Sequence, residues 1–200
     1  MMKITPLFCK PLIEVNIDMG IDIGTKNIEK TFSKFKLEKH NNSNLMYLSL
    51  DMNVLKKFTK LKKIIDKVIK DINSNVWKID KELMITTSWL TKTEKGGESL
   101  VHNHLNSMFS GVFYFQDSSP IEFSHIRTNT IYDPPLENNV YNSSKWVLNP
   151  KQNDLILFPS ELNHQIKKSK IEETRYSIAF NVLPKGLLGY KDSIIKIGEI

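Results

Sequence analysis

Two different periodicities divide this 200-residue chain. Between residues 53 and 74, apolar side chains recur at spacings of three, four or one, and lysines fill most of the positions between them. On a helix this spacing gathers the apolar side chains into one stripe and turns the lysines toward solvent. The pattern predicts one amphipathic helix, over about residues 53–74, that needs a sheet or another helix to cover its stripe. The apolar positions are Leu55, Phe58, Leu61, Ile64, Ile65, Val68, Ile69 and Ile72.

From about residue 83 the pattern changes to short runs rich in Ile, Val, Phe, Tyr and Trp. Clusters of Gly, Pro, Asn, Asp and Ser separate these runs, the first of them being the sequence KGGES. Short strands at this spacing are typical of an antiparallel sandwich or jelly roll. A parallel sheet would need helical crossovers, and the pattern after residue 75 predicts none. The predicted strands lie within residues 83–90, 110–116, 121–126, 146–149, 154–160, 164–168 and 175–183.

Composition excludes several classes of protein. An apolar fraction of 40% and an aromatic fraction of 10% exclude a disordered chain, which buries too little surface to offset its ordering entropy. No stretch approaches the roughly 18 apolar residues that a membrane span needs, and no secretory apolar run follows the first methionine. The only cysteine, Cys9, excludes an internal disulfide and a cysteine-based zinc site. We expect a cytoplasmic protein.

The net charge of +6 is compatible with nucleic-acid binding, but the type and position of the charged residues argue against it. Arginine, the residue favoured for base and phosphate contacts, occurs only at positions 127 and 175. A surplus made of lysine is more typical of a solvated helix face, so we expect a small-molecule or peptide substrate rather than nucleic acid. Much of the surplus lies on the predicted helix, at Lys56, Lys57, Lys60, Lys62, Lys63, Lys67 and Lys70.

Three of the five histidines form a candidate metal site. His102 and His104 flank one residue, and in an extended chain such positions project to the same side. A third histidine, His164, closely follows the apolar run LILFPS. The H-x-H pair alone also suits the solvent face of a strand, so the third histidine strengthens the interpretation. Of the remaining two, His40 is expected in an exposed polar loop, and His125 could point to either face of its strand.

Arg175 opens the strand that comes eleven residues after His164. If the two flanking strands are antiparallel neighbours, the guanidinium enters the same cavity as the histidine. The alternative is a turn ion pair with Glu172 or Glu173, which would contribute little energy. A metal beside a guanidinium suits a cosubstrate with two carboxylates, one chelated by the metal and the other bound bidentately by the arginine.

Four blocks of the sequence together resemble the Fe(II)- and 2-oxoglutarate-dependent oxygenases. The nearest likeness is to an uncharacterised group, often found in bacteriophage and bacterial genomes, with the pattern H-x-H, SGVYY, LFPS-x-x-x-H and R-x-S-x-x-F-N. The resemblance covers about residues 84–184, with Trp89 fitting the strand before the metal motif. The blocks are His102-x-His104, Ser110–Phe115, Leu157–Ser160 with His164, and Arg175–Asn181.

The resemblance implies roles for particular positions. His102 and His164 fall where the first and the distal iron-binding histidines lie. Arg175 falls where the residue that grips the far carboxylate of 2-oxoglutarate lies. Tyr114 matches a position that reaches the same carboxylate in related prolyl hydroxylases, and Ser177 would share the strand face of Arg175.

The fold class expected from pattern and resemblance is mainly β with a flanking helix (α+β): a double-stranded β-helix of the jelly-roll, cupin-like kind. Residues 1–82 would form an extended segment and an amphipathic helix that packs on the barrel. Residues 83–185 would form the oxygenase core and residues 186–200 a C-terminal tail. Residues 4–16, with two prolines, suit an edge strand or an extended entry segment.

One position departs from the superfamily pattern. Most members use H-x-D, which gives two histidines and one carboxylate, whereas this chain has His104 in place of the aspartate. The similar group carries the same H-x-H, which favours ligation by His104. Otherwise Glu98 or Glu122 would substitute, or the metal would not be iron. Three histidines and a water are also a common zinc arrangement.

The function implied by the resemblance is that of a dioxygenase with Fe(II) and 2-oxoglutarate as cofactor and cosubstrate. It would hydroxylate an unidentified substrate and release succinate and CO2. One alternative is a cupin-like metal-binding protein, with zinc or another metal and no oxygenase activity. Another is a basic interaction protein that uses the lysine helix. Asn106, Trp89 and Asn181 could border the substrate pocket, although strand packing or a turn explains each of them equally well.

Overall fold

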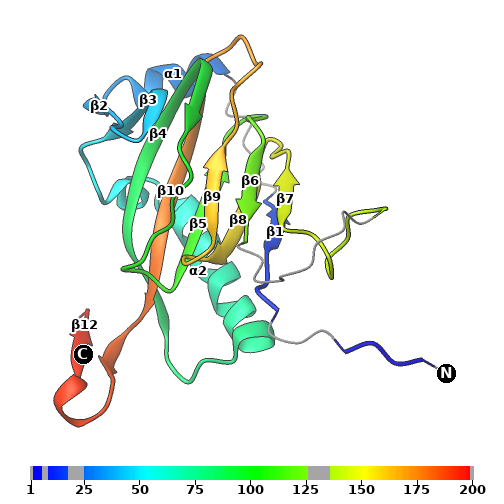
Figure 1. The fold of residues 1–200 in the computed structure, drawn as a ribbon. Helices are drawn as coiled ribbons and strands as arrows, with labels where there is room; N and C mark the ends of the chain where they lie inside the picture. Colours follow the sequence, from blue (N-terminus) through cyan, green and yellow to red (C-terminus); the bar gives the residue numbers. More distant parts are fainter. Residues whose placement is uncertain (1, 6–8, 18–24, 126–135, 199–200) are drawn as a thin grey trace.

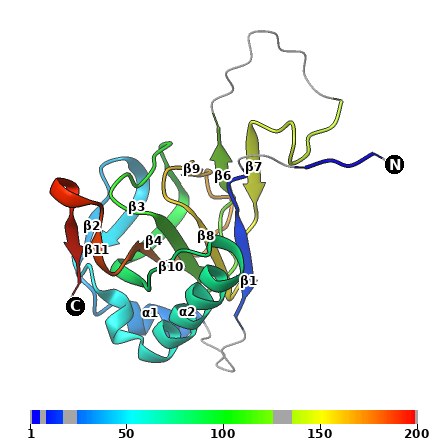
Figure 2. The same cartoon turned by 90° about the horizontal axis from the view of Figure 1, so that it is seen from below.

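The computed structural model describes residues 2–5, 9–17, 25–125 and 136–198 of the chain. Two antiparallel sheets pack face to face, and helices cover the outer face of the larger one (Figures 1 and 2). The seven strands of the large sheet follow the order β1-β8-β5-β10-β4-β3-β2. They are β1 (Ile13–Asn16), β2 (Leu37–Lys39), β3 (Ser43–Ser49), β4 (Leu83–Ser99), β5 (Phe109–Tyr114), β8 (Asp154–Pro159) and β10 (Arg175–Pro184).

The small sheet has the order β7-β6-β9 and lies opposite the part of the large sheet formed by β5, β8 and β1 (Figure 1). Its strands are β6 (Ile121–Ser124), β7 (Lys145–Leu148) and β9 (Asn163–Ile166). The helical elements are α1 (Thr25–Phe32), η1 (Val54–Lys57), α2 (Thr59–Ile72), η2 (Asn73–Trp77) and η3 (Lys191–Ser193). In the described part of the chain, no helix is long and apolar enough to cross a membrane.

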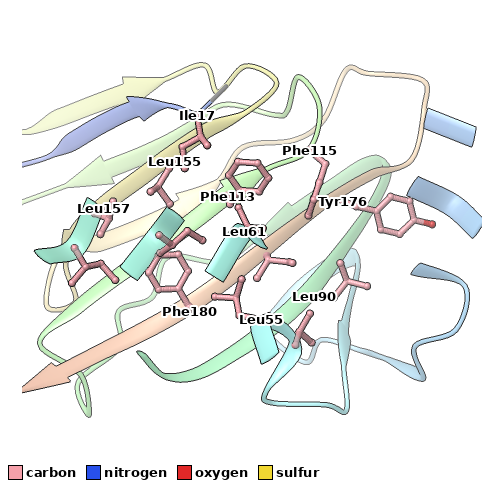
Figure 3. Close-up of a cluster of buried hydrophobic side chains, with 14 of the residues drawn as sticks. Ile17, Leu55, Leu61, Leu90, Phe113, Phe115, Leu155, Leu157, Tyr176 and Phe180 are labelled. Carbon is pink, nitrogen blue, oxygen red and sulfur yellow. The ribbon is translucent and has the colours of Figure 1, made fainter. Parts of the chain in front are cut away.

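The central strands β5 and β8 of the large sheet bury both of their faces, against different partners. On β5, Phe113 points to the helix side, whereas its neighbour Tyr114 points between the sheets. This follows from the two-residue period of a strand, and the register continues it across the sheet, where Phe113 pairs with Ile178 of β10. The outer core, between helices and sheet, is shown in Figure 3. The inner core consists of Tyr114, Ile121, Phe123, Leu148, Ile156 and Phe158.

The predicted helix forms, but in two pieces. The expected single helix over residues 53–74 is interrupted at Phe58, whose φ of −113° and ψ of 62° are not helical. The 3-10 turn η1 precedes this break and α2 follows it. Helix α2 buries Leu61, Ile65 and Ile69 against the large sheet, as the apolar stripe requires.

All seven predicted strands are present, and one of them is longer than expected. The expected separator KGGES lies inside β4, which runs on through residues 95–99 and pairs with β3 beyond an irregularity at residues 44–46. Pattern analysis did not predict α1, β2 or β3. The predicted edge strand is β1, which pairs with β8 at one margin of the large sheet.

The proposed division of the chain at residues 82 and 185 stays a prediction. Strands from the first segment, β1, β2 and β3, are continuous with the large sheet of the second. The expected tail contains a hairpin of its own, β11 (Gly186–Leu188) with β12 (Ile195–Ile197), which projects from the end of β10 (Figure 1).

Candidate functional site

The three histidines picked out by the sequence come together between the sheets. His102 lies just beyond the end of β4, and His164 lies on β9. The two backbones form an antiparallel bridge, in which the N–H of each residue donates to the carbonyl of the other at 2.8–2.9 Å. His104 follows two residues later, its N–H donating to the carbonyl of Ser160 at 2.8 Å. One ring nitrogen from each histidine lies within 4.8 Å of the others.

Hydrogen bonds leave two of these rings ready to bind a cation. Nδ1 of His102 is 2.9 Å from the carbonyl of Leu100, and Nδ1 of His164 is 2.9 Å from that of Leu162. A carbonyl only accepts, so each Nδ1 carries the proton in the neutral ring and each Nε2 keeps its lone pair. Such a partner on the far nitrogen is the usual way in which a protein orients a metal-binding histidine.

Burial keeps the rings neutral. Burial first, and the nearby His102 second, lower the pKa of His164 to about 3 and that of His104 to about 4. Neutral imidazole is the form that binds a metal. Aromatic rings fix the orientation: Phe158 meets His164 edge-on at 4.8 Å, and Trp89 lies 5.9 Å from His104, measured between ring centroids.

No carboxylate completes the cluster among the residues that the structure describes. Glu122, a sequence-level substitute for the missing aspartate, instead contacts Gln165, Lys145 and Lys167. Glu98, the other substitute, lies on β4 and is not part of the cluster.

The two remaining histidines differ from each other. His125 is exposed and lies outside the cluster. His40 lies in the predicted loop, between β2 and β3, but it is partly buried rather than exposed. It also interacts electrostatically with His102 and His104, since the turn between β2 and β3 packs against the end of β4.

Arg175 is buried between the sheets without an anionic partner. Its residue is 2% exposed, and no ion pair joins it to any described carboxylate, including Glu172 and Glu173. Nη1 donates to the hydroxyls of Ser119 and Ser169, Nη2 lies 3.4 Å from the carbonyl of Glu94, and Nε has no partner. Burial lowers the pKa of Arg175 to about 10, so the group stays charged at neutral pH.

Tyr114 and Ser177 lie beside Arg175 on the same face of the large sheet. Ser177 is two positions along β10 from Arg175 and pairs directly with Tyr114 on β5. The hydroxyl of Tyr114 is buried and has no hydrogen-bond partner, and burial raises its pKa, so it keeps its proton. One step further along this face, Ala179 pairs with Trp89, whose ring approaches His104. The face therefore runs from the guanidinium to the histidines.

These groups fit a metal and a dicarboxylate. The three imidazoles offer neutral nitrogen ligands of the kind that Fe(II) and Zn(II) accept. A buried charge without a counter-charge is costly, and the unpartnered Nε of Arg175 and hydroxyl of Tyr114 are donors with no acceptor. An anionic group placed between these two residues would satisfy both.

Sequence reasoning missed the serines that support the site, although it named Asn181 as a residue that could border the pocket. Ser119 and Ser169, which contact Arg175, lie in loops whose composition predicts only turns. Ser110, Ser160 and Asn181 belong to the quoted motifs, and the structure joins them in one hydrogen-bonded chain. Their place in those motifs was the available signal.

Residues 87–181 match the family model described as "Putative 2OG-Fe(II) oxygenase". The matched segment begins in β4, ends in β10 and contains all three histidines and Arg175. The curated proteins contain no significant match to the chain.

Solved structures resemble the chain in fold at low sequence identity. HygX from Streptomyces hygroscopicus, solved with nickel and 2-oxoglutarate, shares 10% identity at a TM-score of 0.61, covering 88% of this chain and 83% of its own. A prolyl-4-hydroxylase from Pseudomonas putida shares 10% at 0.58, covering 88% and 93%. A prolyl hydroxylase from Trichoplax adhaerens, in complex with a hypoxia inducible factor peptide fragment, shares 13% at 0.60, covering 86% and 83%. The predicted fold class, a double-stranded β-helix with a flanking helix, is confirmed.

Proposed function

We propose that this chain is an Fe(II)- and 2-oxoglutarate-dependent oxygenase, in which His102, His104 and His164 hold the Fe(II). The match of residues 87–181 to the 2OG-Fe(II) oxygenase family model supports this proposal. Arg175, Tyr114 and Ser177 would bind the far carboxylate of 2-oxoglutarate. Bound iron supplies the oxidative chemistry, in which 2-oxoglutarate, O2 and a substrate C–H bond give succinate, CO2 and an alcohol. The protein positions the reactants for that chemistry.

The observation that carries this proposal is the buried guanidinium of Arg175, which has no counter-ion in the described structure. A metal-binding protein without a carboxylate cosubstrate would gain nothing from this costly group. A planar fork matches a carboxylate bidentately, and the neutral phenol of Tyr114 can add a third donor. The pairing of Ser177 with Tyr114 puts another hydroxyl on the same patch.

The ligand set distinguishes this site from the commoner one with two histidines and a carboxylate. With three neutral ligands, the bound ion keeps one more positive charge, which strengthens its attraction for the anionic cosubstrate. Zinc accepts the same three nitrogens and is the competing metal. The reaction itself, rather than metal content alone, therefore has to separate the oxygenase from a metal-binding protein without redox activity.

We further propose a small-molecule or peptide substrate and a cytoplasmic location. The lysine-bearing helix α2 packs on the outer face of the large sheet, whereas the histidines lie on the inner side. Phosphates bound along α2 would therefore lie away from the metal. The single, exposed thiol of Cys9 suits a reducing compartment.

The test begins with protein prepared without oxygen and titrated with Fe(II) and 2-oxoglutarate. We expect one metal ion and one 2-oxoglutarate per chain, and succinate release once O2 is admitted. His164→Ala should abolish metal binding and succinate release, whereas His125→Ala, which changes an exposed histidine outside the cluster, should keep both. Succinate release from His164→Ala at the wild-type rate would refute the proposal.

A second pair of variants tests the cosubstrate site. Arg175→Ala should keep the metal and lose most of its 2-oxoglutarate affinity. Arg175→Lys should bind 2-oxoglutarate more weakly than the wild type because an ammonium cannot donate as a fork. Equal 2-oxoglutarate affinity in wild type and Arg175→Ala would favour the alternative without oxygenase activity.

A further inference from the structure

A chain of buried hydroxyls leads from the backbone beside His104 to the amide of Asn181. The hydroxyls of Ser160 and Ser110 are 2.7 Å apart, and Ser110 Oγ donates to Asn181 Oδ1 at 2.9 Å. The single proton of Ser110 is used on Asn181, so Ser160 must be the donor to Ser110. Ser160 is 0% exposed and Ser110 2% exposed, which leaves these bonds out of competition with solvent. Two buried hydroxyls are thus committed to orienting one side-chain amide.

The oriented amide lies at the metal end of the barrel. Asn181 is two positions along β10 from Ala179, on the same face, and Ala179 pairs with Trp89. The ring of Trp89 in turn approaches His104, whose N–H is bonded to the carbonyl of Ser160. Arg175 lies at the opposite end of this strand face. The amide is therefore on the metal's side, away from the carboxylate-binding end.

The two N–H groups of the Asn181 amide donate to no described residue, whereas its oxygen is engaged by Ser110. Nδ2 is not a buried atom without a partner, as Nε of Arg175 is; it is accessible to solvent. Since the hydroxyl chain fixes the oxygen on one side, the two N–H groups are fixed on the other. A rigid, accessible donor beside a reaction centre is a recognition group.

The residues that strand pairing and backbone hydrogen bonds place nearest to this donor are uncharged. Asn181 pairs with Thr87 on β4, and the loop that carries Leu105 and Met108 lies against the next residue of β10, where Met108 N–H donates to the carbonyl of Val182. Leu105 is 80% exposed and Met108 40% exposed. An ammonium or a phosphate would find no counter-charge among these side chains. The chemistry that fits is a neutral acceptor next to apolar surface, such as the carbonyl of a peptide amide.

We propose that the amide of Asn181, held by Ser110 and Ser160, binds the primary substrate by donating to a peptide carbonyl, with the ring of Trp89 and the Leu105–Met108 loop covering the adjoining side chain. This inference rests on the proposed function and narrows its substrate class to peptides. If Asn181 binds substrate through its N–H groups, the NMR signal of those groups should change when a ligand binds. If Asn181 only packs between strands, that signal should not change.

The test uses full-length protein loaded with Zn(II) and 2-oxoglutarate, which binds without turnover. The probes are N-acetyl amino-acid N-methylamides, one for each proteinogenic side chain. The side-chain NH2 signal of Asn181, assigned by its loss in Asn181→Asp, should shift with at least one probe. Loss of one neutral hydrogen bond should weaken that probe about threefold to tenfold in Asn181→Ala. Asn44→Ala, which changes an exposed amide on β3, should bind the probe like the wild type.

Asn181→Asp guards against a merely structural effect, because its carboxylate still accepts from Ser110 but can no longer donate. It should bind the probe at least as weakly as Asn181→Ala. The inference is overturned if no probe shifts the NH2 signal, if the probe binds Asn181→Ala as tightly as the wild type, or if the signal shifts with 2-oxoglutarate alone. Metal and 2-oxoglutarate titrations of the same wild-type sample report on the proposed function separately, so the two failures can be told apart.

Discussion

At the scale of single residues, Tyr114 combines a cost in folding with a use in binding. Its ring packs in the inner core, but its buried hydroxyl has no partner. Leaving such a group unpaired costs about 1–3 kcal/mol, and Tyr114→Phe removes the group while keeping the ring. We expect the urea unfolding free energy of the ligand-free variant to be unchanged or higher by about 1 kcal/mol. Its 2-oxoglutarate dissociation constant, measured on Zn(II)-loaded protein, should rise about threefold to tenfold.

The proposal predicts that Tyr114→Phe keeps or raises the unfolding free energy while it weakens 2-oxoglutarate binding. A tyrosine that only fills space would leave 2-oxoglutarate affinity unchanged. A hydroxyl with an unseen structural partner would make the variant less stable. Either result would remove Tyr114 from the proposed carboxylate site.

The lowered pKa values of His164 and His104 predict acid sensitivity in the metal-free protein. An unfolded histidine titrates near 6.5, whereas the folded values are about 3 and about 4. Below pH 6.5 the unfolded chain binds protons that the folded chain does not, so the unfolding free energy falls as pH falls toward 4. We expect a loss of about 1 kcal/mol per pH unit from His164, which is 5% exposed, and less from the more exposed His104.

Urea unfolding of the metal-free protein at pH 7 and pH 5 measures this loss. Most carboxylates stay ionised over that interval, so the difference comes mainly from histidines. His164→Ala, already less stable at pH 7, should lose less on acidification than the wild type. Equal stability of the wild type at the two pH values would contradict the neutral, buried state of these rings.

The residues proposed to bind the metal and 2-oxoglutarate could be found in the sequence, but those that support them could not. His102, His104, His164 and Arg175 stand out because their types are chemically distinctive and their motifs flank predicted strands. Serines are common in turns, so nothing in the sequence separates the two that contact Arg175 from the others. Their role depends on loops meeting in space, which a pattern along one strand does not encode.

At the scale of elements, Gly111 explains why the SGVFY motif needs its glycine. Gly111 of β5 pairs with Phe180 of β10, and the ring of Phe180 lies over it. A Cβ at position 111 would clash with that ring, which is 0% exposed. We therefore expect Gly111→Ala to lower the unfolding free energy by about 1–3 kcal/mol, measured by urea denaturation.

A double variant separates crowding from loss of backbone freedom. Shortening the ring in Gly111→Ala/Phe180→Leu should recover part of the stability that Gly111→Ala loses, relative to Phe180→Leu alone. If the two effects simply add, the contact between the strands is not the reason for the glycine.

Element prediction succeeded where apolar patterning was strong and failed where it was weak. The seven runs after residue 83 form strands because each buries side chains in one or both cores. Strand β2, with the sequence LEK, lies at the sheet margin and buries none of its residues, so it carries no pattern. The helix break at Phe58 is equally hidden, because its side chain still joins the outer core. A residue can keep its place in the stripe while its backbone leaves the helix.

At the scale of the whole molecule, the large sheet separates a stabilising side from a reactive side. Its outer face buries helix α2, and its inner face carries the path from Arg175 to the histidines. The inner side holds a bare guanidinium and three clustered imidazoles, and ligands would relieve the cost of both. Ligands should therefore raise the thermal stability of the protein, and the effect of 2-oxoglutarate should require that the metal is bound first. Zn(II) should raise the thermal unfolding midpoint by itself, and 2-oxoglutarate should add to it only when the metal is present.

The size of this linkage follows from mass action, because a ligand at a hundred times its dissociation constant adds about 2.7 kcal/mol to the unfolding free energy. Differential scanning fluorimetry with Zn(II), with 2-oxoglutarate, with both and with EDTA measures the order directly. Arg175→Ala should keep the response to Zn(II) and lose the added response to 2-oxoglutarate, whereas His164→Ala should lose both. Stabilisation by 2-oxoglutarate that is equal with and without metal would mean that the two ends of the barrel do not share one cosubstrate. The proposal of one shared site would then be wrong, even if the histidines bind the metal and Arg175 binds 2-oxoglutarate.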